Sequence, residues 1–312
     1  MRCLAPTMPI DGIQPPTFLL RSRSPTRYTS LGFGGLRRVG RVLTMKEERV
    51  SGVVRLYRHR ALIVNFVKRD LLARYKGSAM GVFWSVAHPL VMLLLYTLVF
   101  SVILRVRVGA AEGTQIFALY LFCGMLPWNA FQEGISRSTG VIFDHANLIK
   151  RTIFPPEILP TYIVLSCLVN ELIGLAILLG AVGLTAHGLG LPLLFLPVIL
   201  LLQAAFTLGL AWIVAAINVF LRDVGQLLGM ILTLWLFLTP IFYPPSLIPK
   251  SLEWMLLVNP MGWVVEAYRS VILRSAFPAA WPMAALALCS AIVFGAGYRL
   301  FQRMQGAFAD VI

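Results

Sequence analysis

Six long, mainly apolar stretches limit most strongly how this chain can fold. A helix needs roughly 20 mainly apolar residues to cross a bilayer. Stretches of this kind occupy about 82–104, 115–136, 157–186, 191–219, 225–243 and 279–300. The chain is 58% hydrophobic and 13% charged, which leaves too little polar surface for a soluble protein of 312 residues. We therefore expect an all-α integral membrane protein with six transmembrane helices per subunit.

The basic residues are placed unevenly along the chain. The net charge is +14, and residues 1–81 hold sixteen Lys and Arg against four Asp and Glu, so +12 of the charge precedes the first apolar stretch. With six spans, twenty-two basic residues fall on one side of the membrane and five on the other. The positive-inside rule then predicts that both termini are cytoplasmic. We expect the basic residues just before the first apolar stretch, which we call the basic collar, to bind anionic lipid headgroups. Binding to nucleic acid is a weak alternative.

The sequence before the first stretch divides into two parts. Residues 1–44 are rich in Pro, Gly, Ser and Arg without apolar periodicity, which predicts a disordered basic extension or a misassigned start before Met45. Residues 45–81 are expected to form an amphipathic interfacial helix and a basic collar, and Lys68 leaves open a division into two helices. The apolar stripe predicted for this helix consists of Val50, Val53, Val54, Tyr57, Ala61, Val64, Leu71 and Tyr75.

The connection between the fifth and sixth stretches is too long for a turn and too apolar for a solvated loop. It contains two short apolar pieces, at about 251–258 and 262–273, separated by Asn259-Pro260. Pieces of this length favour re-entrant or interfacial helices at the outer face, and a hydrophobic loop packed on the bundle is the alternative. Residues 82–312 would then form one transmembrane domain.

No enzyme motif is present in the sequence. G-x-x-x-x-G-K-[ST], H-E-x-x-H and G-x-S-x-G are all missing, and the histidines and cysteines show no metal-ligand spacing. We therefore expect no catalysis, metal or cofactor in this chain. Glu133 and Glu171 lie within apolar stretches. A carboxyl group in such a place either belongs to a functional site or forms a structural hydrogen bond to a neighbouring helix.

A cytoplasmic segment joins the second and third stretches. It reads SRSTGVIFDHANLIKRTIFPPEILP over residues 136–160, and it interleaves polar and apolar residues before ending at Pro155-Pro156. An amphipathic segment stopped by prolines is typical of a docking helix for a soluble partner. A solvated loop helix without a partner is the alternative.

The stretch LLARYKGSAMGVFWSVAHPLVMLLLYTLVFSVIL resembles the first part of the ABC-2 type permeases that export polysaccharides and polyol phosphates, typified by the O-antigen and teichoic acid exporters. Met80 replaces the leucine that is usual in this family. Further matches follow in family order: GMLPWNAFQEGISRSTG, NLIKRTIFPPEILP, NVFLRDVGQLLGMILTLWLFLTPIFYP and NPMGWVVEAYRSVIL. The resemblance covers about Met45 to the C-terminus.

The resemblance implies a homodimer of six-span subunits in the bacterial inner membrane, joined by two copies of an ABC ATP-binding subunit. That subunit would carry the ATP and magnesium, and this chain no cofactor. The lipid-linked polysaccharide would cross through a conduit along the dimer, with the helix of residues 45–81 as a gate at its cytoplasmic mouth. The outer-loop helices would cap the opposite end.

The resemblance also assigns expected roles to individual residues. The lipid-linked pyrophosphate would be met by Arg74, Tyr75 and Lys76. The conduit would be lined by the aromatic residues Trp84, Tyr96, Trp128 and Phe131, although an interfacial aromatic belt explains the same residues. The segment 141–151 would couple to the ATPase through Asp144, His145, Asn147, Lys150 and Arg151.

Other classes of protein remain open from the sequence. An ABC-2 permease could move a drug or another lipid, and a self-sufficient channel or carrier would need no ATPase. A membrane transferase acting on polyprenyl-linked sugars should show a cluster of acidic or histidine residues, for which Asp144, His145 and Asp223 are too sparse. The identity, length and capping of the glycan stay undetermined, as does a carbohydrate-binding domain on the ATPase.

Overall fold

The structure is a computed structural model that describes residues 52–74, 76, 81–103, 114–151, 154–184, 190–245 and 248–312. The described residues belong to one compact unit, Ser51–Ile312. Residues 1–51 lie outside the described residues, and so do the predictions for residues 1–44. Regular secondary structure in the described part is helical throughout, without strands. The predicted all-α class is confirmed.

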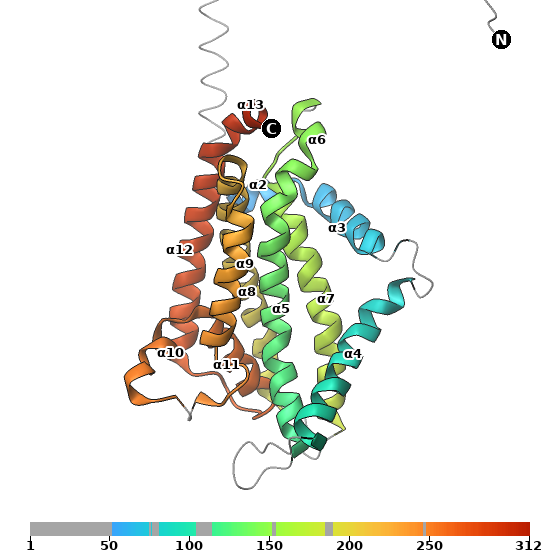
Figure 1. Ribbon diagram of the computed structural model, residues 1–312, viewed down its shortest axis with the longest axis vertical. Helices are drawn as coiled ribbons and strands as arrows, with labels where there is room; N and C mark the ends of the chain where they lie inside the picture. The colour runs from blue at the N-terminus through green and yellow to red at the C-terminus, as the bar shows by residue number, and fades with distance from the viewer. Residues whose placement is uncertain are drawn as a thin grey trace, which may run out of the picture. The chain divides into compact units, whose positions relative to one another are not determined.

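Four long helices form the framework of this unit (Figure 1). They are α5 (Thr114–Asp144), α7 (Ile158–Gly183), α8 (Leu196–Phe220) and α12 (Ala280–Met304). Helix α8 packs against α12 and against α5, and α5 also packs against α7. Helices suit such apolar sequence because each satisfies its own backbone hydrogen bonds where water is excluded.

Shorter helices pack around these four. They are α2 (Gly52–Arg58), α3 (Arg60–Arg74), α4 (Trp84–Tyr96), α6 (Ala146–Arg151), α9 (Val224–Leu238), α10 (Trp254–Val258), α11 (Pro260–Ile272) and α13 (Phe308–Val311). Short irregular helical turns join or extend them: η1 (Gly81–Phe83), η2 (Thr97–Ile103), η3 (Leu191–Phe195), η5 (Lys250–Leu252) and η6 (Gln305–Ala307). Helices α10 and α11 lie at the opposite end of the bundle from α6 and α13 (Figure 1).

Each of the six predicted spans corresponds to a helix, but the helices differ in length. Within the described residues, three are long and apolar enough to cross a membrane: Ile158–Gly183, Leu191–Phe220 and Ala280–Ala307. Two are shorter apolar helices, Trp84–Val99 and Val224–Leu238. Helix α5 has 31 residues and continues past the predicted end at 136, to Asp144. The chain is therefore a multi-pass membrane protein by its helices, and the count of six spans stays a prediction.

The N-terminal helical segment divides at His59, a turn, into α2 and α3. The apolar side chains that pack against the bundle are Leu56, Leu62, Ile63, Phe66 and Val67. The predicted stripe is not this packed face, since its members Val54, Tyr57 and Val64 are exposed. The stripe faces away from the bundle, as side chains at a lipid interface would, and the interfacial position of the segment stays a prediction.

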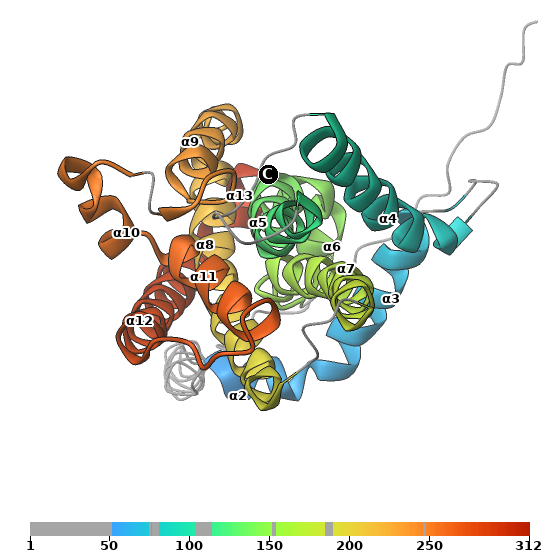
Figure 2. The same cartoon turned by 90° about the horizontal axis from the view of Figure 1, so that it is seen from below.

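The two short helices expected between the fifth and sixth spans are present as α10 and α11. Asn259 separates them and begins α11, because its side-chain oxygen accepts a hydrogen bond from Gly262 N at 3.2 Å and Pro260 occupies the first turn. Helix α11 is not a surface element, since it packs against α5, α8 and α12 (Figure 2). Burial against protein provides the polar partners that a short helix lacks in lipid.

Candidate functional site

A cavity of about 580 Å³ lies between α4 on one side and α5 and α7 on the other, with the end of α3 at its mouth. The end nearest α3 is polar and includes Arg74, His88 and Glu133. The rest of the lining is mainly apolar and includes Met92, Tyr96, Phe122 and Met125, but Asn129, Asn170 and Glu171 also belong to it. The cavity therefore combines a charged mouth beside α3 with a mainly apolar interior that also holds a few polar side chains.

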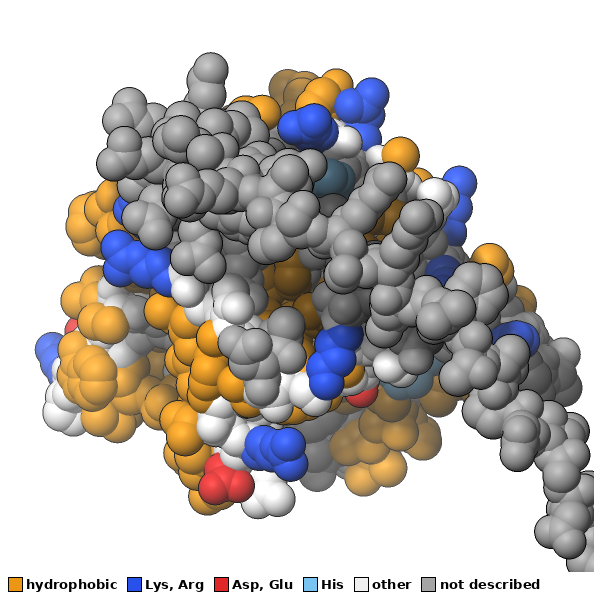
Figure 3. All heavy atoms as spheres, turned by 90° about the horizontal axis from the view of Figure 1, so that it is seen from above, with side chains coloured by type: hydrophobic (Ala, Val, Ile, Leu, Met, Phe, Trp, Pro, Cys, Tyr) orange, Lys and Arg blue, Asp and Glu red, His pale blue; other side chains and the backbone are white. Residues whose placement is uncertain are grey.

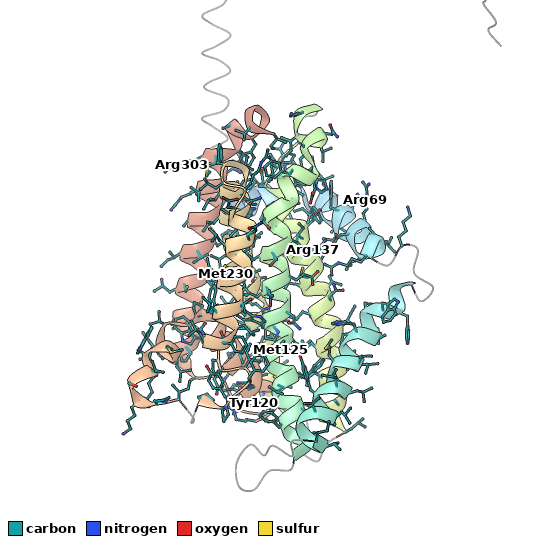
Figure 4. All side chains as sticks on the ribbon, in the orientation of Figure 1. Arg69, Tyr120, Met125, Arg137, Met230 and Arg303 are labelled. Atoms are coloured by element: carbon teal, nitrogen blue, oxygen red, sulfur yellow. The ribbon has the colours of Figure 1, made fainter. Side chains whose placement is uncertain are left out.

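Four charged side chains from α3 and α5 form a cluster at this mouth, which we call the charge cluster: Asp70, Arg74, Glu133 and Arg137. Arg74 Nη1 lies 2.7 Å from Glu133 Oε1, and Arg74 Nε lies 3.3 Å from Asp70 Oδ2. Arg137 contacts the same two carboxylates, with Nη2 2.5 Å from Asp70 Oδ1. The cluster thus fastens α3 to α5 at the mouth of the cavity. Figure 4 labels its member Arg137, on α5.

The charge cluster contains two arginines and two carboxylates, and it depends on Asp70 being ionised. Burial raises the pKa of Asp70, but the hydrogen bond and charge of Arg137 and the charge of Arg74 outweigh it, so the pKa lies below its ordinary value of 3.8. Asp70 is therefore ionised throughout the physiological pH range, and the cluster persists there.

The predicted phosphate-binding residues lie at this mouth only in part. Arg74 belongs to the charge cluster and lines the cavity, so its guanidinium is already engaged by two carboxylates. Lys76 is exposed, and Tyr75 lies outside the described residues. Neither Asp70 nor Arg137 was among the predicted site residues. Asp70 stands four residues before Arg74 on one helix, a spacing that favours an ion pair and would have indicated the first partner.

The four predicted conduit aromatics fall into two pairs. Trp84 and Tyr96 line the cavity. Trp128 and Phe131 are 0% exposed and belong to the core within this subunit. They pack with Phe206 and Trp235, including a stacked pair between Phe131 and Phe206 at 5.8 Å, and Trp128 Nε1 donates to Gln132 at 2.8 Å. In this structure Trp128 and Phe131 thus serve packing.

The segment 141–151 forms the end of α5, a turn at His145, and α6. Asp144, Asn147 and Lys150 are exposed, whereas the side chain of Arg151 lies outside the described ones. His145 turns inward, with Nδ1 3.0 Å from the Val141 carbonyl oxygen and its ring against Phe66 of α3. The segment therefore presents polar side chains outward while contacting the helix at the mouth of the cavity.

These features define the class as a helical multi-pass membrane protein with an amphiphilic cavity between its helices. The chain belongs to the ABC-2 type transporter family, whose profile matches residues 61–273. It is a transport subunit by family rather than a catalytic enzyme.

Three relatives show similarity over most of the chain. An O-antigen export system permease protein RfbA from Myxococcus xanthus is 34% identical over 261 residues, which cover 82% of this chain and 97% of the relative. Two proteins of the same name from Klebsiella pneumoniae are 26% identical over 254 and 257 residues, each covering 80% of this chain and 95% of the relative.

Proposed function

We propose that this chain is the membrane subunit of an ATP-driven exporter that moves lipid-linked polysaccharide, such as O-antigen, across the bacterial inner membrane. The similarity to the Myxococcus xanthus O-antigen export permease carries the proposal, because it extends over 97% of that relative's length. Membrane helices around an amphiphilic cavity suit a cargo with a lipid anchor and a charged linkage.

We propose further that the subunit has six spans, with both termini cytoplasmic, and that it works as a homodimer. The exposed apolar faces of α4 and α9, where Leu94 and Met230 are each 67% exposed, would then face the second subunit or lipid. Basic side chains lie among hydrophobic ones on the end of the bundle that carries α6 and α13 (Figure 3). That distribution supports a cytoplasmic location for this end.

The charge cluster suggests how an anionic linkage would reach the cavity. Guanidinium groups bind phosphate oxygens in pairs of parallel hydrogen bonds, so Arg74 and Arg137 suit a pyrophosphate. Lys76 adds an exposed positive charge beside them. In this proposal the pyrophosphate replaces Glu133 as the partner of Arg74, and α3 acts as the gate.

A separate ATP-binding subunit, in two copies, supplies the energy in this proposal, with ATP and magnesium bound there. The exposed side chains Asp144, Asn147 and Lys150 form the surface that docks on it. Because His145 contacts Phe66 on α3, a movement of the segment 141–151 would displace α3 through this contact. Coupling of this kind requires that the docked subunit favour one of two arrangements.

The experiment that tests the proposal is co-expression with an ABC-type ATP-binding protein from the same genome. The complex is purified, placed in lipid nanodiscs, and assayed for ATPase activity with and without lipid-linked glycan. Co-purification with a rate altered by the glycan is expected. An intact chain that recruits no ATPase would exclude the ATP-driven exporter, and an unaltered rate with glycan present would exclude the cargo.

A further inference from the structure

Glu171, Gln203 and Tyr268 form a closed ring of polar side chains inside the bundle. They come from α7, α8 and α11, and none is more than 3% exposed. Tyr268 Oη lies 2.6 Å from Glu171 Oε1 and 3.0 Å from Gln203 Oε1. Gln203 Nε2 closes the ring at 2.8 Å from Glu171 Oε2. Three contacts therefore need three hydrogens, one for each pair of atoms.

The orientation of the Gln203 amide follows from a fourth contact. Gln203 Nε2 also lies 3.3 Å from the carbonyl oxygen of Pro127 on α5. A carbonyl oxygen only accepts hydrogen bonds, so the amide nitrogen must occupy this position and Oε1 must face Tyr268. The two hydrogens of the amide are then used by Glu171 and Pro127.

The remaining two contacts share the single hydroxyl hydrogen of Tyr268. Gln203 Oε1 only accepts, so the Tyr268 hydrogen is needed for that contact. The contact at 2.6 Å between Tyr268 and Glu171 then needs a hydrogen from the carboxyl group. We propose that Glu171 is a proton-binding site and holds its proton in this structure.

The surroundings of Glu171 agree with a neutral acid. The described residues that hydrogen-bond it, Gln203 and Tyr268, are uncharged. The next residue on α11, Arg269, directs its guanidinium to the backbone oxygens of Pro240 and Ile241 instead. An ionised carboxylate without a cationic partner is costly to bury in a membrane bundle.

Other titratable groups line the cavity that Glu171 borders. These are Arg74, His88, Tyr96, Glu133 and Cys167. Arg74 is paired with Glu133 and Asp70, so its charge is already balanced. Helix α8 carries no charged residue, and the charged residues of α5 include Glu133 and Arg137 of the charge cluster. Protonation also keeps the wall of the cavity at Glu171 uncharged.

The proton on Glu171 determines whether all three contacts of the ring are hydrogen bonds. Without it, Tyr268 can donate to Glu171 or to Gln203 but not to both, so one contact places two lone pairs against each other. The ring joins α7 and α8 to α11, and through Pro127 to α5. The occupied proton site thus attaches α11, which follows α10, to the helices around the cavity.

Infrared difference spectroscopy of the full chain in nanodiscs at neutral pH tests the proposal. The wild type minus Glu171→Gln spectrum should show the carbonyl stretch of a protonated carboxylic acid, lost in the variant. Glu133→Gln is the matched control, because Glu133 borders the same cavity but pairs with arginines, and it should lose carboxylate bands only. A spectrum in which Glu171→Gln also loses only carboxylate bands would overturn the proposal.

A second measurement compares thermal unfolding of three variants. Glutamine at 171 can donate an amide hydrogen to Tyr268 and accept one from Gln203. Glu171→Gln should therefore unfold at the same temperature as the wild type. Glu171→Ala and Tyr268→Phe leave buried polar groups without partners and should melt several degrees lower. The proposal fails if Glu171→Gln does not fold or melts like Glu171→Ala, because an amide completes the same ring.

Discussion

The backbone of Gly209 on α8 lies directly against the backbone of α12 where Gly297 faces it. A Cβ added at Gly209 would lie 2.6 Å from the carbonyl carbon and oxygen of Val293, and one added at Gly297 would overlap the carbonyl oxygen of Gly209. Small residues at such crossings allow membrane helices to approach closely. The α8–α12 contact therefore depends on two glycines.

We expect Gly209→Ala and Gly297→Ala each to lower the free energy of unfolding by about 1–3 kcal/mol, because backbone atoms cannot move aside for a methyl group. Gly295→Ala is the matched control on α12, since a Cβ there meets no atom within 4 Å. Thermal unfolding in detergent measures all three. Equal melting of Gly295→Ala and Gly297→Ala would contradict the close contact.

Arg269 holds together the end of the bundle that carries α10 and α11. Its guanidinium donates to Pro240 O at 2.6 Å and to Ile241 O at 2.9 Å, and lies 3.4 Å from the centre of the Tyr120 ring. Arg269→Ala should lower the free energy of unfolding by about 3 kcal/mol or more, since two buried charge-assisted hydrogen bonds are lost. The measurement is chemical unfolding in micelles.

Arg274→Ala provides the comparison for this arginine. Arg274 is 53% exposed and pairs with Glu266, so its removal should cost about 0–1 kcal/mol. If the two alanine variants unfold alike, Arg269 does not secure the end of α9.

Asp70 should contribute a pH-dependent part of the stability. Its pKa in the folded state is below the ordinary 3.8, because the pull of Arg137 and Arg74 exceeds the effect of burial. Such a group stabilises the fold fully above its ordinary pKa, and that contribution is lost as the pH falls through the folded-state pKa. Asp70→Asn should therefore be less stable than wild type at neutral pH.

The difference between wild type and Asp70→Asn should shrink as the pH falls below about 4. Unfolding curves of both proteins, recorded from neutral to acid pH, measure it. A difference that stays constant down to the acid limit would show that the carboxylate charge is not what stabilises the contact between α3 and α5.

Lys150 should matter for coupling and not for folding. It is exposed on α6, so Lys150→Glu is expected to leave melting unchanged, while export and the retention of the ATP-binding subunit fall several-fold. Lys250→Glu, an exposed lysine near α10 at the other end of the bundle, is the control and should retain both. Normal export by Lys150→Glu would remove this residue from the proposed docking surface.

Part of this protein could be predicted from the sequence because its signals are local. The length and apolarity of each stretch determine that helices form, and Asn259-Pro260 marks where α11 begins. The 34% identity to an export permease agrees with the resemblance carried by motifs such as NPMGWVVEAYRSVIL. These features depend on residues that are neighbours in the chain.

Contacts between distant residues were decided only by the tertiary structure. The sequence did not indicate that Arg74 pairs with Glu133, and its predicted role toward a ligand stays a prediction. Trp128 and Phe131 were expected in a conduit, and the structure buries them in the core of this subunit. The hydrogen-bond partners of Glu171 are Gln203 and Tyr268, which lie 32 and 97 residues away in the chain. Apolar helices have several faces of similar hydrophobicity, so the sequence determines that they pack, and the fit of side chains in three dimensions determines which residues meet.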